Sequence, residues 1–325
     1  MSGRRFYPVI VFALSSSVLA LAKSPHTTQE FIERGDQRLL ADDFRGAEAD
    51  YTRAIDLATR PGDSISYRKE NLKAPDPPEG GNSVRNPIRA IDPTVAALYA
   101  NRCFARYRLN DLTGALRDCD ESITINPRTI DTYRNRALVR LDSGDLDGAL
   151  SDFNRVLQVE TGDGQSYNNR GTIYRKKDQL RLALADLNRA AELLPPLPGV
   201  YYNRGSVKYE LRDFEGASAD FEQSVRLDPR FAPGHYGRGV IHLRSRHYSH
   251  AVDDFTNAIR LDPNLAIAYA NRGIAFIYLG HEEKARADFE SSCLLDPKLQ
   301  ESLKQHAKKL RVDLALQRFL SGFIS

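Results

Sequence analysis

Apolar residues recur along most of this chain at the 3.6-residue spacing of an α-helix, and short turns interrupt them at regular intervals. Two of these turns are Ser143-Gly144-Asp145 and Leu279-Gly280-His281. The pattern predicts helices that fold back on one another in pairs. Because a single pair cannot bury its own apolar faces, the pattern also indicates that the pairs stack along a linear core.

The pattern has a period of 34 residues. It runs without an insertion over residues 96–299, which hold six repeats, and a seventh repeat spans residues 28–61. We number the places of each repeat from 1 to 34, starting at Thr28, Ala96, Ile130, Gly164, Pro198, Ala232 and Ala266.

Several places keep one kind of residue in all or most of the repeats. Small residues at places 8, 20 and 27 let two helices approach closely, and large side chains at places 4 and 24 fill the space beside them. Place 20 is always alanine: Ala47, Ala115, Ala149, Ala183, Ala217, Ala251 and Ala285. Place 4 is aromatic or histidine: Phe31, Tyr99, Tyr133, Tyr167, Tyr201, His235 and Tyr269. Proline closes five repeats: Pro127, Pro195, Pro229, Pro263 and Pro297.

These marks together resemble the tetratricopeptide repeat (TPR) family. The resemblance covers about three quarters of the chain. It implies an all-α fold, a right-handed α-solenoid of stacked antiparallel helix pairs, in which the first helix of each pair lines a concave face. It also implies that the chain binds other proteins.

Three segments lie outside the repeats. Residues 1–22 carry Arg4 and Arg5, then an apolar stretch ending in small residues, which predicts a cleaved signal peptide and a periplasmic or secreted protein. The alternative is an uncleaved anchor in the inner membrane, because an apolar stretch over residues 6–22 is near the lower length limit for a spanning helix. Residues 62–95 are rich in proline and glycine and predict an exposed insertion. Residues 300–325 predict an amphipathic C-terminal capping helix.

Charge and cysteine content indicate whether the chain could bind nucleic acid and whether it could depend on disulfides. The net charge of +3 includes Arg4 and Arg5 of the leader, so the chain lacks the basic excess expected of a nucleic-acid-binding protein. The three cysteines argue against a disulfide framework. Cys103 and Cys119 fall on facing helices of one repeat, which leaves two interpretations open: a single disulfide, or two small buried thiols.

Arginine at place 7 and aspartate at place 23 recur in all seven repeats. We predict that each pair forms a structural ion pair between helices, since a bidentate guanidinium contact would satisfy both charges near the packed seam. Duplication from one ancestor could explain the recurrence without contact. The residues are Arg34 and Asp50, Arg102 and Asp118, Arg136 and Asp152, Arg170 and Asp186, Arg204 and Asp220, Arg238 and Asp254, and Arg272 and Asp288.

Asparagine recurs at place 6 and resembles the asparagine ladder in the superhelical repeats of O-linked N-acetylglucosamine transferases. A side-chain amide has one acceptor and two donor hydrogens, which suits an extended peptide backbone. The alternative is that the asparagines pair locally. The predicted peptide-binding residues of the concave face are Asn101, Asn135, Asn169, Asn203 and Asn271, with Arg134, Tyr202 and Tyr236 beside them.

The predicted partner is a protein or extended peptide. A clamp for a C-terminal carboxylate, as in co-chaperone TPR domains, is disfavoured because Ile32, Asp36 and Asp131 stand where that motif needs other residues. Self-association through an exposed terminal repeat is a further alternative.

No sequence motif for catalysis, a cofactor or a metal site is found, so a non-catalytic scaffold or adaptor is predicted. Four histidines gather in the sixth repeat: His235, His242, His247 and His250. Two of them occupy core places, which favours a packing role. The alternative function is metal binding or catalysis centred on this repeat.

Overall fold

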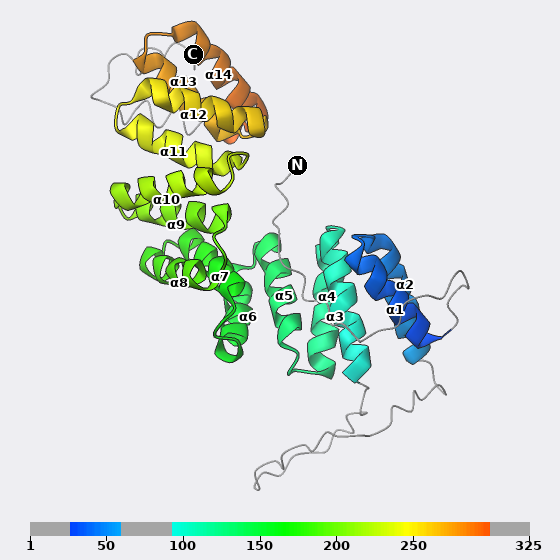
Figure 1. The fold of residues 1–325 in the computed structure, drawn as a ribbon. Helices are drawn as coiled ribbons and strands as arrows, with labels where there is room; N and C mark the ends of the chain where they lie inside the picture. Colours follow the sequence, from blue (N-terminus) through cyan, green and yellow to red (C-terminus); the bar gives the residue numbers. More distant parts are fainter. Residues whose placement is uncertain (1–26, 60–92, 300–325) are drawn as a thin grey trace. The chain divides into compact units, whose positions relative to one another are not determined.

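The computed structural model describes residues 27–59 and 93–299, and these residues form only helices and their connections. The all-α class and the stacked helix pairs predicted from the repeats are therefore confirmed (Figure 1). The predicted signal peptide, the capping helix and residues 62–92 of the predicted insertion lie outside the described residues.

The chain divides into two compact parts at Thr161 and Gly162. The N-terminal part contains α1 (Thr28–Leu40), α2 (Phe44–Ala58), α3 (Pro93–Arg108), α4 (Leu112–Ile125), α5 (Ile130–Ser143) and α6 (Leu146–Val159). The C-terminal part contains α7 (Gly164–Lys176), α8 (Leu180–Leu193), α9 (Pro198–Glu210), α10 (Phe214–Leu227), α11 (Ala232–Arg244), α12 (Tyr248–Leu261), α13 (Ala266–Tyr278) and α14 (Glu282–Leu295). Six first helices begin at place 1 of their repeat, whereas α3 begins three residues before Ala96 at Pro93, a residue favoured in the first turn of a helix.

Within each part, the two helices of a repeat pack on each other, and each second helix packs on the first helix of the next repeat. The first helices of consecutive repeats also contact one another, as α3 contacts α5 and α9 contacts α11. They form one face of each part, which we call the first-helix face.

The packing of the core repeats with the same 34-residue period as the sequence. The alanine at place 20 is fully buried in every described repeat. In the five repeats with glycine at place 8, the large side chain at place 24 lies against that glycine. At Gly239, an added Cβ would meet the ring of Phe255 at 2.8 Å, so glycine is needed for this approach. Burying a ring such as Phe255 contributes about 1.5–3 kcal/mol.

The turn between the two helices of each repeat contains a residue with positive φ at place 15. Glycine adopts this conformation without strain at Gly144 and Gly280. In four repeats, an aspartate at place 16 then caps the second helix by accepting a hydrogen bond from the backbone N–H of the glycine at place 19. These pairs are Asp43 and Gly46, Asp111 and Gly114, Asp145 and Gly148, and Asp213 and Gly216.

In neighbouring repeats, the side chain at place 17 of one repeat also contacts the side chain at place 13 of the next. The guanidinium carbon of Arg108 lies 4.2 Å from the ring centroid of Phe44, and that of Arg244 lies 3.5 Å from the ring centroid of Phe214. In the sixth and seventh repeats, Tyr248 and Tyr278 stack with their ring centroids 4.5 Å apart.

Candidate functional site

All seven described helix pairs contain the same bidentate contact. The arginine at place 7 donates from Nε and Nη2 to the two carboxylate oxygens of the aspartate at place 23, over N–O distances of 2.5 to 3.1 Å. The aspartates are only 2–7% exposed. The seven contacts are Arg34–Asp50, Arg102–Asp118, Arg136–Asp152, Arg170–Asp186, Arg204–Asp220, Arg238–Asp254 and Arg272–Asp288.

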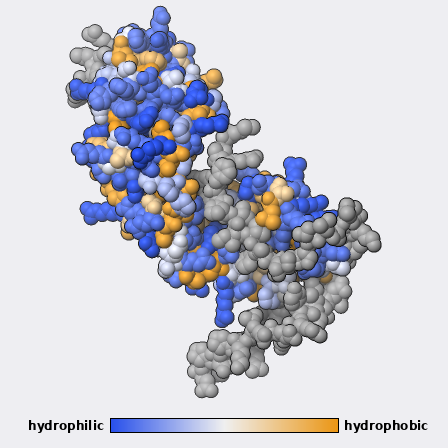
Figure 2. All heavy atoms as spheres, in the orientation of Figure 1, coloured by the Kyte–Doolittle hydropathy of each residue, from blue (hydrophilic) through white to orange (hydrophobic). Residues whose placement is uncertain are grey.

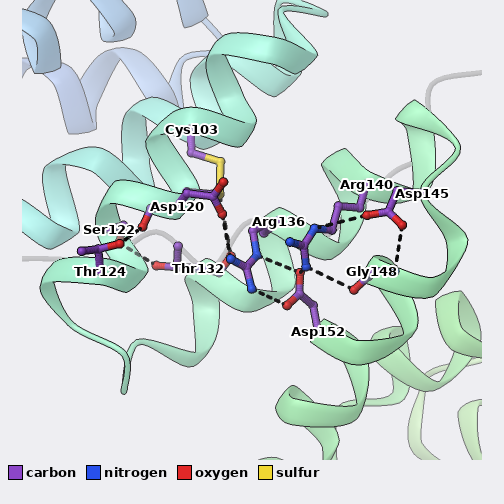
Figure 3. A network of polar contacts seen from close by, with 11 residues as sticks. Cys103, Asp120, Ser122, Thr124, Thr132, Arg136, Arg140, Asp145, Gly148 and Asp152 are labelled. Atoms are coloured by element: carbon purple, nitrogen blue, oxygen red, sulfur yellow. Dashed lines mark hydrogen bonds and ion pairs between the residues drawn. A yellow bond between two sulfur atoms is a disulfide. The ribbon is translucent and has the colours of Figure 1, made fainter.

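Arg102, Arg136, Arg204 and Arg272 also bond to the second helix of the preceding repeat. Nη1 of Arg136 donates to Oδ1 of Asp120 at 2.7 Å, from α5 to the second helix of the repeat before it (Figure 3). Arg102 and Arg272 make the corresponding bonds to the hydroxyls of Thr52 and Thr256. A guanidinium has five donor hydrogens, so one side chain can bond to the second helix of its own repeat and to the second helix of the preceding repeat.

A second cation, at place 11, joins four of these pairs and was not predicted from the sequence. Nη1 of Arg140 donates to Oδ2 of Asp152 at 2.6 Å (Figure 3). The equivalent contacts are Arg38 to Asp50, Arg106 to Asp118, and Lys208 to Asp220. Aligning the repeats could have revealed it, because a cation stands at place 11 in four of the seven.

The ionisation of these groups follows from their contacts. Hydrogen bonding to Asp186 raises the pKa of Arg170, and hydrogen bonding to Asp220 raises the pKa of Arg204. Both arginines therefore stay charged. Burial raises the pKa of Asp36, which accepts hydrogen bonds from the hydroxyl of Tyr51 at 2.6 Å and from Asn101.

Three of the five place-6 asparagines bond to the first helix of the preceding repeat. Nδ2 of Asn203 donates to Oδ1 of Asn168 at 3.0 Å, and Nδ2 of Asn271 donates to the hydroxyl of Tyr236 at 3.1 Å. Nδ2 of Asn101 lies 3.3 Å from Oδ1 of Asp36. Each of these bonds uses one donor, so the amide oxygen and a second N–H remain.

Asn169 and Asn135 differ from these three. Asn169 is only 4% exposed and lies beside Asn168. Asn135 is half-buried and has no hydrogen bond to any described residue. At the place that supplies an acceptor to Asn203 and Asn271, the repeat before Asn135 has Ala100. Among the residues that the structure describes, nothing uses the hydrogen-bonding capacity of the Asn135 amide.

The other predicted binding residues are engaged within the protein. Arg134 pairs with Asp131 and Glu160. The ring of Tyr202 packs against Phe221, and the ring of Tyr236 packs against Phe255, with centroids 5.8 and 6.0 Å apart. These tyrosines therefore belong largely to the core below the first-helix face.

Cys103 and Cys119 form a disulfide between α3 and α4, with their Cα atoms 5.5 Å apart. The sequence left open whether these residues form a disulfide or remain two buried thiols, and the structure contains the disulfide. Cys103 is at place 8 and Cys119 at place 24, so the bond replaces the packing of a small residue against a large side chain. Both cysteines are fully buried.

Two of the four histidines of the sixth repeat, His235 and His242, lie close to the carboxylate of Asp254. Asp254 is 2.9 Å from Nδ1 of His242 and 3.6 Å from Nδ1 of His235, while Nε2 of His235 donates to the carbonyl oxygen of Pro229. The rings of His242, His247 and His250 lie beside one another. His242 and His250 line an open groove of about 530 Å³, together with Glu222, Arg238 and Asp253. In the part of the chain that the structure describes, no three such side chains are arranged to hold a metal ion.

The described helices include none that is both long and apolar enough to cross a membrane. This observation concerns residues 27–59 and 93–299 only.

Solved structures share the fold at low sequence identity. A tetratricopeptide repeat protein from Parabacteroides merdae is 16% identical, with a TM-score of 0.60 over 92% of this chain and 99% of that chain. A chain of the APC/C hetero-tetramer Cut9-Hcn1 is 13% identical, with a TM-score of 0.59 over 91% of this chain and 55% of that chain. PilF of Pseudomonas aeruginosa is 16% identical, with a TM-score of 0.55 over 70% of this chain and 97% of that chain.

Sequence comparison gives the family directly. No curated protein sequence matches the chain significantly. Family models described as tetratricopeptide repeats match residues 134–198, 198–231, 232–265 and 266–299. Together these matches cover residues 134–299, just over half of the chain, and the described helix pairs share their architecture. The chain belongs to the tetratricopeptide repeat family.

Proposed function

We propose that this protein is an exported, non-catalytic scaffold that binds a protein or extended peptide through the first-helix face of each part. The observation that carries the proposal is the amide of Asn135, which has donors and an acceptor on that face and no bond to a described residue. Burying such a group against a partner without a hydrogen bond would be unfavourable, so it favours a partner that supplies one.

The remaining asparagines offer hydrogen-bonding groups on the first-helix face of their own part: Asn101 in the N-terminal part, and Asn203 and Asn271 in the C-terminal part. Asn101, Asn203 and Asn271 each keep an acceptor and a donor hydrogen after bonding to their neighbours. Arg134 contributes only if a partner's carboxylate displaces Asp131 or Glu160. We therefore assign hydrogen bonding to the asparagines, and a supporting apolar floor to Tyr202 and Tyr236.

A non-catalytic role is supported by the way the repeated polar residues are used. The arginines and aspartates that recur in every repeat are paired with each other across the helix packing. Such groups stabilise the array and are not free to act on a substrate.

Replacing Asn135 by alanine is expected to weaken partner binding by about three- to tenfold, the loss of roughly one hydrogen bond. The partner is first isolated by affinity capture from envelope extract with the purified chain and identified by mass spectrometry. Its binding segment is then titrated as a labelled peptide by fluorescence anisotropy.

The matched control is Gln158→Ala, which removes an exposed amide from the second helix of the same repeat. This variant should bind the peptide as the native chain does. Equal affinity of the native and Asn135→Ala chains, with both folded by circular dichroism, would contradict the assignment of the first-helix face.

Export is proposed from the leader and is supported by the buried disulfide, because disulfides persist mainly in oxidising compartments. We expect the mature chain to begin at Lys23 and to fractionate with the periplasm or the medium. Mass spectrometry of the intact N-terminus checks this. A chain that retains residues 1–22 in the membrane fraction would instead support an inner-membrane anchor.

A further inference from the structure

Places 11, 16, 19 and 23 form one polar network in an ordinary repeat. In the third repeat, Arg140 donates to Asp152 and to the carbonyl oxygen of Gly148, and it lies 3.6 Å from Asp145 (Figure 3). The carboxylate of Asp145 in turn caps the helix at Gly148. The first and second repeats have the same residue types at these four places.

The sixth repeat keeps only the aspartate of this network. Its places 11, 16 and 19 are His242, His247 and His250, and place 23 is Asp254. The centroids of the three imidazole rings lie 5.4, 6.1 and 6.2 Å apart. Three residues that touch in the ordinary network have thus all become histidine in one repeat.

These replacements remove stabilising contacts. His247 makes no side-chain hydrogen bond as the N-cap of α12, whereas Asp145 does so in the third repeat. Place 11 holds His242 instead of the arginine or lysine of four other repeats, so Asp254, which is 3% exposed, lacks the permanent positive charge at that place. A ligand that restores a positive charge and links the two helices at this point would compensate for both losses.

Asp254 orients His242. Its carboxylate accepts hydrogen bonds from Arg238, and Oδ2 lies 2.9 Å from Nδ1 of His242. Because Nδ1 contacts the carboxylate, Nε2 is the ring nitrogen that a neutral His242 would offer to a metal ion. Metal-ligating histidines are commonly oriented by a carboxylate in this way.

We propose that His242, His247 and His250 bind one divalent transition-metal ion, such as Zn²⁺ or Ni²⁺, with Asp254 orienting His242. Neutral imidazoles suit these ions, and three of them leave a fourth position for water. The groove beside His242 and His250 is lined by Glu222 and Asp253, which favour a cation, and by Arg238, whose charge is paired with Asp254.

Binding requires a small rearrangement of two exposed side chains. In a tetrahedral site with metal–nitrogen distances of about 2.0–2.1 Å, ring centroids would be separated by roughly 5 Å. His247 and His250 are exposed and lie near that distance, so rotation of their side chains can gather the donor atoms that are not gathered in the described arrangement.

The test uses the untagged full chain, stripped with a chelator, and isothermal titration with ZnCl₂ and NiCl₂. We expect one ion per chain, a higher melting temperature with metal, and a tetrahedral visible spectrum with Co²⁺. Single His247→Ala and His250→Ala variants should bind at least about tenfold more weakly. His281→Ala is the matched control, because His281 has the same place in the seventh repeat as His247, and it should leave affinity unchanged.

A variant with His242→Arg, His247→Asp and His250→Gly rebuilds the residue types of the third repeat. It should fold without metal, bind no ion and show no metal-dependent change in melting temperature. Absence of stoichiometric binding by the native chain would overturn the proposal. Binding that is unchanged in the folded triple variant would overturn it as well.

Discussion

Replacing Asp152 by alanine is expected to lower the free energy of unfolding of the N-terminal part by about 2–4 kcal/mol. Its carboxylate accepts hydrogen bonds from both Arg136 and Arg140 and is 2% exposed. Removing it leaves two guanidinium groups, 14% and 21% exposed, without their shared partner. Water reaches both arginines in part, so the loss is smaller than for a fully buried pair.

The measurement is urea unfolding followed by circular dichroism, together with amide hydrogen exchange resolved to α5 and α6. Exchange is needed because helical repeats can open locally. The matched control is Asp186→Ala, since place 11 of that repeat is Tyr174 and the structure gives Asp186 one ion-pair partner, Arg170. An equal loss in both variants would show that the second cation contributes nothing.

Replacing both Cys103 and Cys119 by alanine is expected to destabilise the N-terminal part by about 3 kcal/mol or more. The disulfide closes a short loop with a sequence separation of 16, and its loss increases the conformational freedom of the unfolded chain. The smaller side chains also leave unfilled space between α3 and α4, where both cysteines are fully buried. Urea unfolding with and without a reductant measures the effect.

A rescue variant separates the covalent bond from the packing. Cys103→Gly with Cys119→Phe copies the pairs formed by Gly205 and Phe221 and by Gly239 and Phe255. It should recover part of the stability and become insensitive to reductant. If it is no more stable than the double alanine variant, the space between α3 and α4 does not accept the packing used by the other repeats.

The fold was predictable because every repeat carries the same packing rule. The alanine at place 20, such as Ala149, and the large residue at place 24, such as Phe153, are buried wherever the 34-residue period puts them. Seven copies of one weak pattern leave few alternatives to stacked helix pairs.

The polar contacts were harder to predict, because residues of different types serve at one place. Place 11 holds Arg140, Lys208 and His242, which all contact the aspartate, but also Tyr174 and Phe276. The acceptors of Asn203 and Asn271 are likewise an amide and a phenol. A sequence shows that the asparagine recurs, but it does not show which hydrogen-bond acceptor the preceding repeat provides.

The disulfide shows a different limit. The sequence places Cys103 and Cys119 on facing helices, yet spacing alone does not distinguish a covalent bond from two buried thiols. The distance between the Cα atoms is what makes the bond geometrically feasible.

The contacts between place 17 and place 13 of the next repeat determine which segment can be exchanged as a module. Phe214 contacts Arg244, and Tyr248 stacks on Tyr278. At the equivalent places of the fourth and fifth repeats, the residues are Leu180 and Glu210. Recombination at the boundary of a helix pair would separate such partners and place an arginine opposite a leucine. Recombination in the short turn inside a pair would keep them together. The segment that can be inherited, duplicated or transplanted intact is therefore a second helix with the first helix that follows it.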